Sequence, residues 1–142
     1  MIIKQLSVFL ENEKARLCEV ADTLAQHHIN IRALSLADTT EFGILRLIVD
    51  QPDKGREVLA EAGIVVRVTN VLALSTQDAP GGALGALRVL AECGINVEYM
   101  YAYVAKVSGK AIMIMQVEDL EVAEEILRRH GFEQADFAGF GD

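Results

Sequence analysis

The segment Leu90-Ala91-Glu92-Cys93-Gly94-Ile95-Asn96-Val97 repeats Leu24-Ala25-Gln26-His27-His28-Ile29-Asn30-Ile31, which lies 66 residues earlier. The same offset relates Leu6 to Leu72, Asn12 to Asp78 and Gly43 to Gly109. A repeat of this length is a small domain rather than a solenoid unit. Each copy places a polar turn before a helix and an Asn after it, and such paired sites suit binding and sensing better than a single catalytic centre.

Length and composition limit the class of protein. With 142 residues, the chain forms one ordinary domain or two very small ones, each with only a marginal core. The hydrophobic fraction of 51% and the mean hydropathy of +0.26 are high, so we expect apolar surface to be buried between the halves or in an oligomer. A net charge of −8 makes nucleic acid an unsuitable partner.

Several other classes are also disfavoured. No apolar run approaches the length of a membrane span, and the N-terminus lacks the layout of a signal peptide, so we expect a cytoplasmic protein without membrane contact. His27, His28 and His130 are too few and too scattered for a metal site, and we expect no cofactor. Cys18 and Cys93 lie outside any CxxC spacing and are expected to be small buried residues, with a metal or redox pair as the alternative.

Hydrophobic periodicity predicts the order β-α-β-β-α-β in each half. In the first half we expect strands over 3–10, 29–37, 42–49 and 64–68, turns over 12–15 and 38–41, a helix with Leu17, Val20, Ala21, Leu24 and His28 inward, and a helix from Pro52 to Gly63. In the second half we expect strands over 71–75, 95–104, 110–117 and 132–137, turns over 78–82 and 108–109, a helix with Leu87, Leu90, Ala91 and Gly94 inward, and a helix ended by Gly131.

This order is the split β-α-β arrangement of ferredoxin-like folds. The predicted fold class is α+β, with two ferredoxin-like repeats, antiparallel sheets and helices on one face. The predicted domains are residues 1–69 and 70–142. The second strand of each repeat is then an edge, which is open to pairing with the edge of another unit.

Tyr99, Tyr101 and Tyr103 share one face of a predicted edge strand. The next strand, Ala111 to Met115, is apolar on both faces, whereas a sheet with one wet face should alternate. We therefore expect the second face to be covered by another sheet, from a partner chain or the other half. The alternative is that a tyrosine stacks on a ligand.

The turn before the first helix of the second repeat has the chemistry to hold a free amino acid. Gly81 and Gly82 carry no Cβ, so a ligand could approach the backbone at a helix N-terminus, which attracts carboxylates. Asp78 is placed to cap the helix or to receive an ammonium group. The alternative is a capped helix start in which the glycines serve packing.

Asn30 and Asn96 are predicted at the start of the strands that follow these helices. Asn is unfavourable within strands, so its recurrence is informative. The alternative is an Asn that hydrogen-bonds local backbone.

With these features together, the chain resembles two tandem ACT domains, the amino-acid-sensing modules of biosynthetic enzymes and regulators. The family's pattern is Asp or Asn, Pro-Gly, a Leu-bearing helix and a Gly-(Ile/Val)-Asn-Ile strand start. The second copy matches it in Asp78-Ala79-Pro80-Gly81 and Gly94-Ile95-Asn96-Val97. The first copy keeps Asn12, Leu17 and Ile29-Asn30-Ile31, but has Lys14-Ala15 in place of Pro-Gly and His28 in place of Gly.

The resemblance implies ligand binding at an interface between ACT units, where the turn of one unit meets the edge strand of a neighbour. Residue by residue, it points to a second-repeat site of Asp78, Ala79, Pro80, Gly81, Gly82, Asn96 and Val97. It also points to a first-repeat site of Asn12, Glu13, Ala15, Arg16, Leu17, Asn30 and Ile31. Ala15 adds a methyl group where the backbone should be bare, and Arg16 either adds charge for a carboxylate or is merely solvated, so we expect ligand first at the second-repeat site.

The leading hypothesis is a stand-alone regulatory protein that binds a free amino acid and forms a homo-oligomer, most simply a dimer. We expect no catalysis, because no serine has a histidine at a telling position and the acidic residues fall mostly on helix faces. The alternative is an oligomerisation or docking module for a metabolic enzyme, in which the ligand sites are vestigial.

Overall fold

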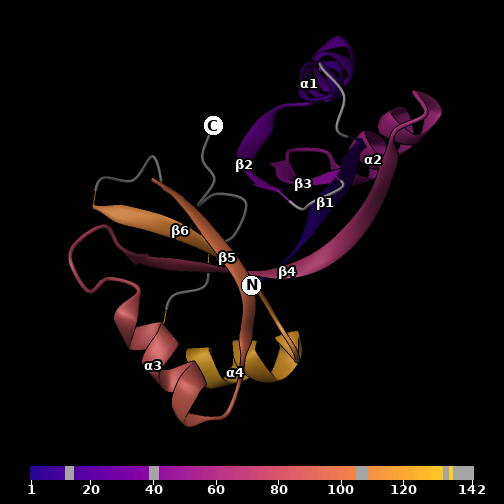
Figure 1. Cartoon of the computed structure of the whole chain (residues 1–142). Coiled ribbons are helices and arrows are strands. Elements are labelled where there is room, and N and C mark those ends of the chain that lie inside the picture. The colour runs from indigo at the N-terminus through magenta and orange to yellow at the C-terminus, as the bar shows by residue number, and fades with distance from the viewer. Residues whose placement is uncertain (12–14, 39–41, 105–108, 133–134, 136–142) are drawn as a thin grey trace. The chain divides into compact units, whose positions relative to one another are not determined.

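The computed structural model describes residues 1–11, 15–38, 42–104, 109–132 and 135 (Figure 1). The elements are β1 (Ile2–Glu11), α1 (Arg16–Gln26), β2 (Ile31–Asp38), β3 (Phe42–Val49), α2 (Pro52–Glu61), β4 (Val65–Gln77), α3 (Leu84–Glu92), β5 (Val97–Val104), β6 (Lys110–Val117) and α4 (Leu120–Arg129). None of these described helices is both long and apolar enough to cross a membrane.

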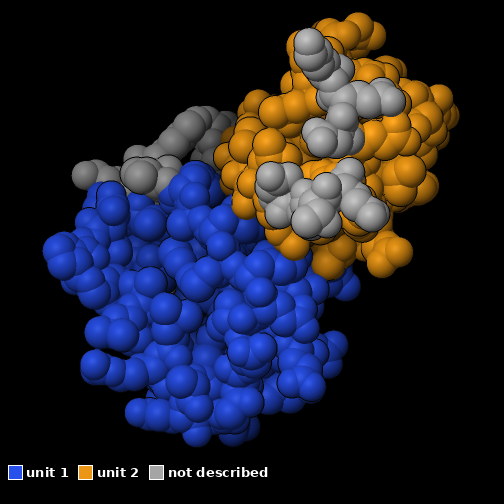
Figure 2. Space-filling model, viewed as in Figure 1, with its two compact units in different colours: residues 1–3, 70–142 blue, residues 4–69 orange. Residues whose placement is uncertain are grey.

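The chain divides into two compact units, coloured separately in Figure 2. Unit 2 is Lys4–Thr69, and unit 1 combines Met1–Ile3 with Asn70–Asp142. The strand order is β2-β3-β1-β4 in unit 2 and β1-β4-β6-β5 in unit 1. The paired strands β1/β3, β2/β3, β4/β6 and β5/β6 are all antiparallel. The α+β class with two ferredoxin-like repeats is confirmed, and so is the edge position of each repeat's second strand, β2 and β5.

The core of unit 2 lies between one face of its sheet and its two helices. Leu6 and Val8 of β1 lie opposite Leu47 and Leu45 of β3, because alternate residues of a strand share a face. The helices α1 and α2 bury Val20, Leu24, Val58 and Leu59 in the same cluster. Burial of this one face is what fixes the strand register, since a shift by one residue would expose the whole set.

Unit 1 repeats this plan with its own residues. Leu72 and Leu74 of β4 lie opposite Met115 and Met113 of β6. The helices α3 and α4 contribute Ala86, Leu90, Ala123 and Leu127 to the same buried cluster. Leu6 and Leu72, like Leu24 and Leu90, are related by the sequence repeat, and all four side chains are fully buried.

Each of the described helices ends in the same hydrogen-bonded turn. At α1 the His28 amide donates to the Ala25 carbonyl oxygen and the Ile29 amide donates to that of Leu24, both at 3.0 Å. This is a Schellman motif, which requires a left-handed residue after the C-cap. The left-handed residue is glycine at Gly63, Gly94 and Gly131, whereas α1 uses His28 with φ of 57°.

Some predicted boundaries differ from the structure. The separate strands expected over 64–68 and 71–75 are one continuous strand, β4, because no turn interrupts the chain at Thr69 and Asn70. The strands β2 and β5 each begin two residues later than predicted, immediately after Asn30 and Asn96. Of the turns predicted over 12–15, 38–41 and 108–109, residues 12–14, 39–41 and 108 lie outside the described residues.

The strand predicted over 132–137 is also not seen in its described residues, Phe132 and Ala135. Beside β4 in unit 1, the Ala73 amide donates to the Met1 carbonyl oxygen (2.7 Å) and the Met1 ammonium donates to the Ala73 oxygen (3.0 Å). The Ala135 amide also reaches the Ala73 oxygen, at 3.2 Å. Met1 and Ala135 therefore both lie beside β4 at Ala73 within unit 1.

The helices bury fewer residues than the periodicity suggested. On α1 the exposed residues include Leu17, at 45%, and Ala21, whereas on α3 Leu87 is half-buried and Ala91 is exposed. The expectation that both cysteines are buried is wrong, because Cys18 and Cys93 are exposed. Cys18 lies two positions before the buried Val20 and so points to the opposite face of the helix, and Cys93 is the C-cap of α3.

The tyrosines of β5 share one face, as predicted. Tyr101 and Tyr103 pair in register with Ile114 and Ile112 of β6, on the face opposite the helices. Ile112 and Ile114 are buried on that face. The face is therefore not a solvated one.

Candidate ligand-binding turns

The turn of the second repeat runs from Asp78 to Ala83 between β4 and α3. The Gly82 amide donates to the Ala79 carbonyl oxygen (2.9 Å), and the Leu84 amide donates to that of Gly81 (3.1 Å). The N-cap of α3 is Ala83, which makes no side-chain cap. The expectation that Asp78 caps the helix is therefore wrong, because a cap residue reaches only the next two or three amides and α3 begins six residues later.

The two glycines of this turn have different environments. A Cβ on Gly82 would lie 1.9 Å from the Gln77 carbonyl oxygen, so no side chain fits there. Gly81 has φ of 79°, and a Cβ on it would meet nothing within 4 Å. Gly82 is therefore required for close packing of the turn, while Gly81 faces open space.

In the first repeat an alanine has the left-handed φ that Gly81 has in the second. Ala15, 66 residues before Gly81, has φ of 68° and ψ of 4° and is the N-cap of α1. Its carbonyl oxygen accepts a hydrogen bond from the Glu19 amide (2.9 Å). The predicted site residues Asn12 and Glu13 lie outside the described residues.

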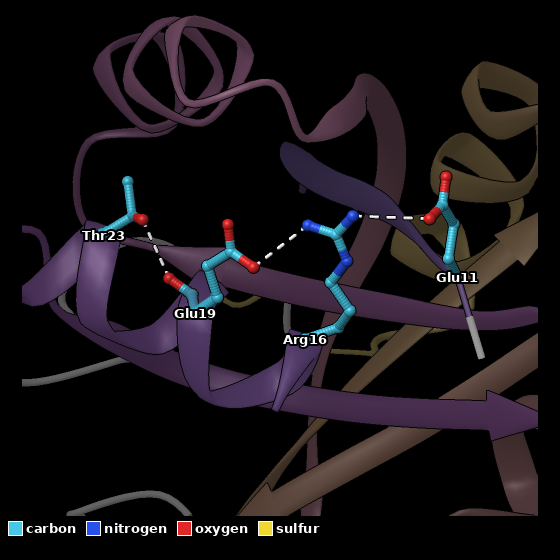
Figure 3. A network of polar contacts seen from close by, with 4 residues as sticks. All are labelled: Glu11, Arg16, Glu19 and Thr23. Carbon is cyan, nitrogen blue, oxygen red and sulfur yellow. Dashed lines mark hydrogen bonds and ion pairs between the residues drawn. The ribbon is translucent and has the colours of Figure 1, made fainter. Parts of the chain in front are cut away.

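Arg16, the first residue of α1, bridges two acidic side chains (Figure 3). Its Nη1 donates to Glu19 Oε2 at 3.0 Å, within α1, and its Nη2 donates to Glu11 Oε2 at 3.3 Å, at the end of β1. The Thr23 hydroxyl donates to the Glu19 carbonyl oxygen one turn further along (2.8 Å). The guanidinium is thus held at the junction of β1 and α1, and it is not merely solvated.

A cavity of about 190 Å³ adjoins this junction within unit 2. Its lining residues come from β1, α1 and the segments around Phe42 and Ile64, and they are Phe9, Leu10, Glu11, Arg16, Val20, Phe42, Gly63, Ile64 and Val65. The rings of Phe9 and Phe42 meet edge to face with centroids 6.1 Å apart. Of the predicted site residues, Arg16 therefore lines a cavity.

The apolar walls of this cavity are not among the site residues predicted from the sequence. A signal for them was present in β1, where Phe9 and Glu11 alternate with Val8 and Leu10 and so point to the face away from the helices. The register Glu11 to Phe42 brings a second ring to that face. Only the pairing of β1 with β3 reveals this, because Phe9 and Phe42 are far apart in sequence.

The structure does not bring the two asparagines to the turns of their own repeats. Asn30 precedes β2 at the far end of α1 from Ala15, and an 11-residue helix is about 16 Å long. Its amide donates to Asp50 Oδ1 (3.0 Å), and its carbonyl oxygen accepts from the Asp50 amide (3.1 Å). Asn96 is likewise separated from Gly81 by α3. Ile31 and Val97, which begin β2 and β5, lie beside these asparagines.

The described residues hold no group of three or more His, Cys, Asp and Glu side chains that could bind a metal ion. The two turns instead offer charged side chains and apolar surface to a ligand. At the first turn an arginine, two carboxylates and an aromatic-walled cavity lie together, and at the second turn there is a bare glycine backbone.

Comparisons with known proteins place the chain in a family. A search of curated proteins finds no match. Among solved structures, protein BT0572 from Bacteroides thetaiotaomicron is 34% identical, with a TM-score of 0.91 over 99% of this chain and 96% of that one. The ligand-free regulatory subunit of aspartate kinase from Thermus thermophilus shares the fold, with 15% identity and a TM-score of 0.63 over 92% of this chain and 97% of that one. Residues 1–136 match the family model described as an ACT domain pair, and the chain therefore belongs to that family.

Proposed function

We propose that this protein is a stand-alone, cytoplasmic regulatory protein that binds a free amino acid at the turns before α1 and α3. Its ACT-like domains would be residues 1–69 and 70–142. The role is regulatory rather than catalytic, in keeping with the shared fold of a protein described as the regulatory subunit of aspartate kinase. The protein would need no cofactor, nucleic acid or membrane.

One observation carries this proposal. Ala15 and Gly81 occupy equivalent positions 66 residues apart and have the same left-handed backbone, with φ of 68° and 79°. An alanine has no intrinsic reason to adopt this conformation, which costs an L-residue about 1–2 kcal/mol. A left-handed alanine where the second repeat has glycine supports a function for this position, since strain of this kind is concentrated at functional sites.

The position of the asparagines supports a site that is completed by a neighbour. Asn30 and Asn96 lie at the opposite ends of α1 and α3 from the turns, so a ligand at a turn would need the edge strand of another ACT-like unit. We propose that a second copy of the chain supplies it. The exposed leucines of the edge strand β2, Leu34 at 57% and Leu36 at 53%, would be covered in such a homodimer.

The same leucines favour the alternative function, a docking module for a metabolic enzyme with vestigial ligand sites. An apolar stripe on an edge strand suits a protein partner as well as a second copy. The two functions differ in one respect, because a docking module requires no small molecule.

Thermal unfolding in the presence of each of the twenty common amino acids tests the proposal. An amino acid at 100 times its dissociation constant should stabilise the protein by about 2.7 kcal/mol. We expect at least one amino acid at millimolar concentration to stabilise the protein. Calorimetric titration should confirm that this amino acid binds. No response to any of the twenty would contradict amino-acid binding and leave the docking function.

A further inference from the structure

We propose that the cavity of unit 2 takes the side chain of an apolar amino acid, whose carboxylate and ammonium groups pair with Arg16 and Glu11. This inference rests on the proposed function and narrows it to one class of ligand. It also moves the first place to look for ligand from the second repeat to the first.

The size of the cavity fits one side chain. Its volume is about 190 Å³. An apolar protein cavity of roughly 150 Å³ accepts benzene, whereas sites for drug-sized ligands usually measure about 300–1,000 Å³. A branched aliphatic or aromatic side chain therefore fits, while a nucleotide or a larger cofactor does not.

The walls of the cavity combine a fixed floor with an open rim. Leu10, Val20 and Ile64 belong to the buried core of unit 2, so the floor is present before any ligand arrives. Phe42 and Val65 form the rim and are 39% and 66% exposed. A side chain that enters from solvent would cover this exposed apolar surface, which is the driving force for apolar ligands. A charged side chain would instead lose its hydration against Phe42 and Val65 without gaining a partner from these two residues.

The charged groups at the cavity suit a zwitterion. Glu19 holds one side of the Arg16 guanidinium at 3.0 Å, while Glu11 reaches the other at 3.3 Å, which is long for an N–H···O hydrogen bond. The Glu11 side chain is 72% exposed and so is free to turn away. A ligand carboxylate could then take its place on the guanidinium, and Glu11 could receive the ligand's ammonium group. A ligand with a carboxylate alone would pair with Arg16 but would bring no ammonium group to offset repulsion by Glu11 and Glu19.

The second repeat cannot form this site. The residue equivalent to Arg16 is Gly82, where a Cβ would lie 1.9 Å from the Gln77 carbonyl oxygen. No side chain, and therefore no cation, fits at that position. The two turns are thus built for different ligand contacts, and we expect the apolar amino acid at the first repeat only.

Calorimetric titration of the full chain tests the inference with defined probes. L-leucine, L-valine, L-methionine and L-phenylalanine should bind at least tenfold more tightly than L-serine, L-aspartate or L-lysine. Isopentylamine and 4-methylpentanoic acid, which each lack one charged group of leucine, should bind at least tenfold more weakly than leucine.

Three variants locate the site. Val65→Asp, at the exposed rim, and Arg16→Gln should each weaken leucine binding at least tenfold. Val122→Asp is the matched control, because Val122 is an exposed valine (48%) on α4 of unit 1, and it should leave the affinity unchanged. A circular-dichroism melt of each variant checks that the fold is retained.

The outcomes separate the inference from the proposed function. Binding of a polar amino acid in preference to leucine, or leucine binding that survives both Val65→Asp and Arg16→Gln, would overturn the inference and leave amino-acid binding intact. No binding of any amino acid would overturn both.

Discussion

His28 and Gly94 end equivalent helices in the same left-handed conformation, with φ of 57° and 72°. Ala15 and Gly81, which precede those helices, have the same relationship, with φ of 68° and 79°. The first repeat has therefore lost two glycines of the ACT pattern and kept the backbone that they allow. At His28 the surrounding structure imposes that conformation through the Schellman hydrogen bond from the Ile29 amide to the Leu24 carbonyl oxygen.

Replacement of His28 by glycine should stabilise the protein. The change removes about 1–2 kcal/mol of left-handed strain from the folded state. The greater freedom of glycine in the unfolded chain offsets roughly 0.5–1 kcal/mol of this stabilisation. We expect the free energy of unfolding to rise by up to about 1 kcal/mol, measured by urea denaturation. The control is Gly94→Ala, which should lower it by about 1 kcal/mol, and a His28→Gly variant that is less stable than wild type would contradict the account.

Ala15→Gly should also raise the free energy of unfolding, by up to about 1 kcal/mol for the same reason. Because Ala15 lies in the proposed site, the variant also tests the turn. A bare backbone admits a ligand more closely, so amino-acid affinity should be retained or increased in calorimetric titration. Loss of binding in a stabilised Ala15→Gly protein would show that the alanine methyl group is itself a ligand contact.

Gly82→Ala and Gly81→Ala should have unequal effects. At Gly82 the new Cβ would overlap the Gln77 carbonyl oxygen at 1.9 Å, so the turn must change its path and the loss should exceed about 3 kcal/mol. At Gly81 the Cβ meets open space and only the left-handed strain applies, so we expect a loss of about 1–2 kcal/mol. Equal melting temperatures for the two variants would contradict this distinction.

Substitution of the exposed leucines of β2 tests the proposed homodimer. Leu34→Lys together with Leu36→Lys places charges on the edge strand, which disfavours strand pairing. We expect the protein to change from dimer to monomer in sedimentation velocity at micromolar concentration, with unchanged circular dichroism. Val122→Lys on α4 is the control, and a dimer that persists in the double variant would assign the interface to another surface.

The stability of unit 1 should depend on pH through the ammonium group of Met1. Burial lowers the pKa of this group from 8.0, and the ion pair with Glu124, at 3.3 Å, opposes that effect in part. The folded state thus favours the neutral amine, so the free energy of unfolding should rise with pH until about 8, where the unfolded chain also loses its proton. Urea denaturation between pH 6 and 9 measures the slope, and N-terminal acetylation should abolish this contribution.

Much of the fold and part of the site could be predicted from the local sequence. The strands Phe42–Val49 and Lys110–Val117 were predicted to the residue, because each is a mostly apolar run between turn signals. The repeat, the β-α-β-β-α-β order and the two turns also follow from local pattern. Periodicity and turn chemistry depend on residues that are near neighbours in the chain, so both can be recognised from the sequence.

The tertiary structure alone decided the features that depend on distant residues. The cavity exists because Phe9, Phe42 and Ile64 meet from three segments, and the start of β1 pairs with Ala73 across the length of a repeat. The left-handed backbone of Ala15 and His28 likewise contradicts the local preference of both residues and is imposed by their surroundings. The sequence by itself determined that this protein is a duplicated ACT fold with a turn before each first helix, and only packing decided that Arg16 lies beside an apolar cavity, because packing joins residues that no local pattern connects.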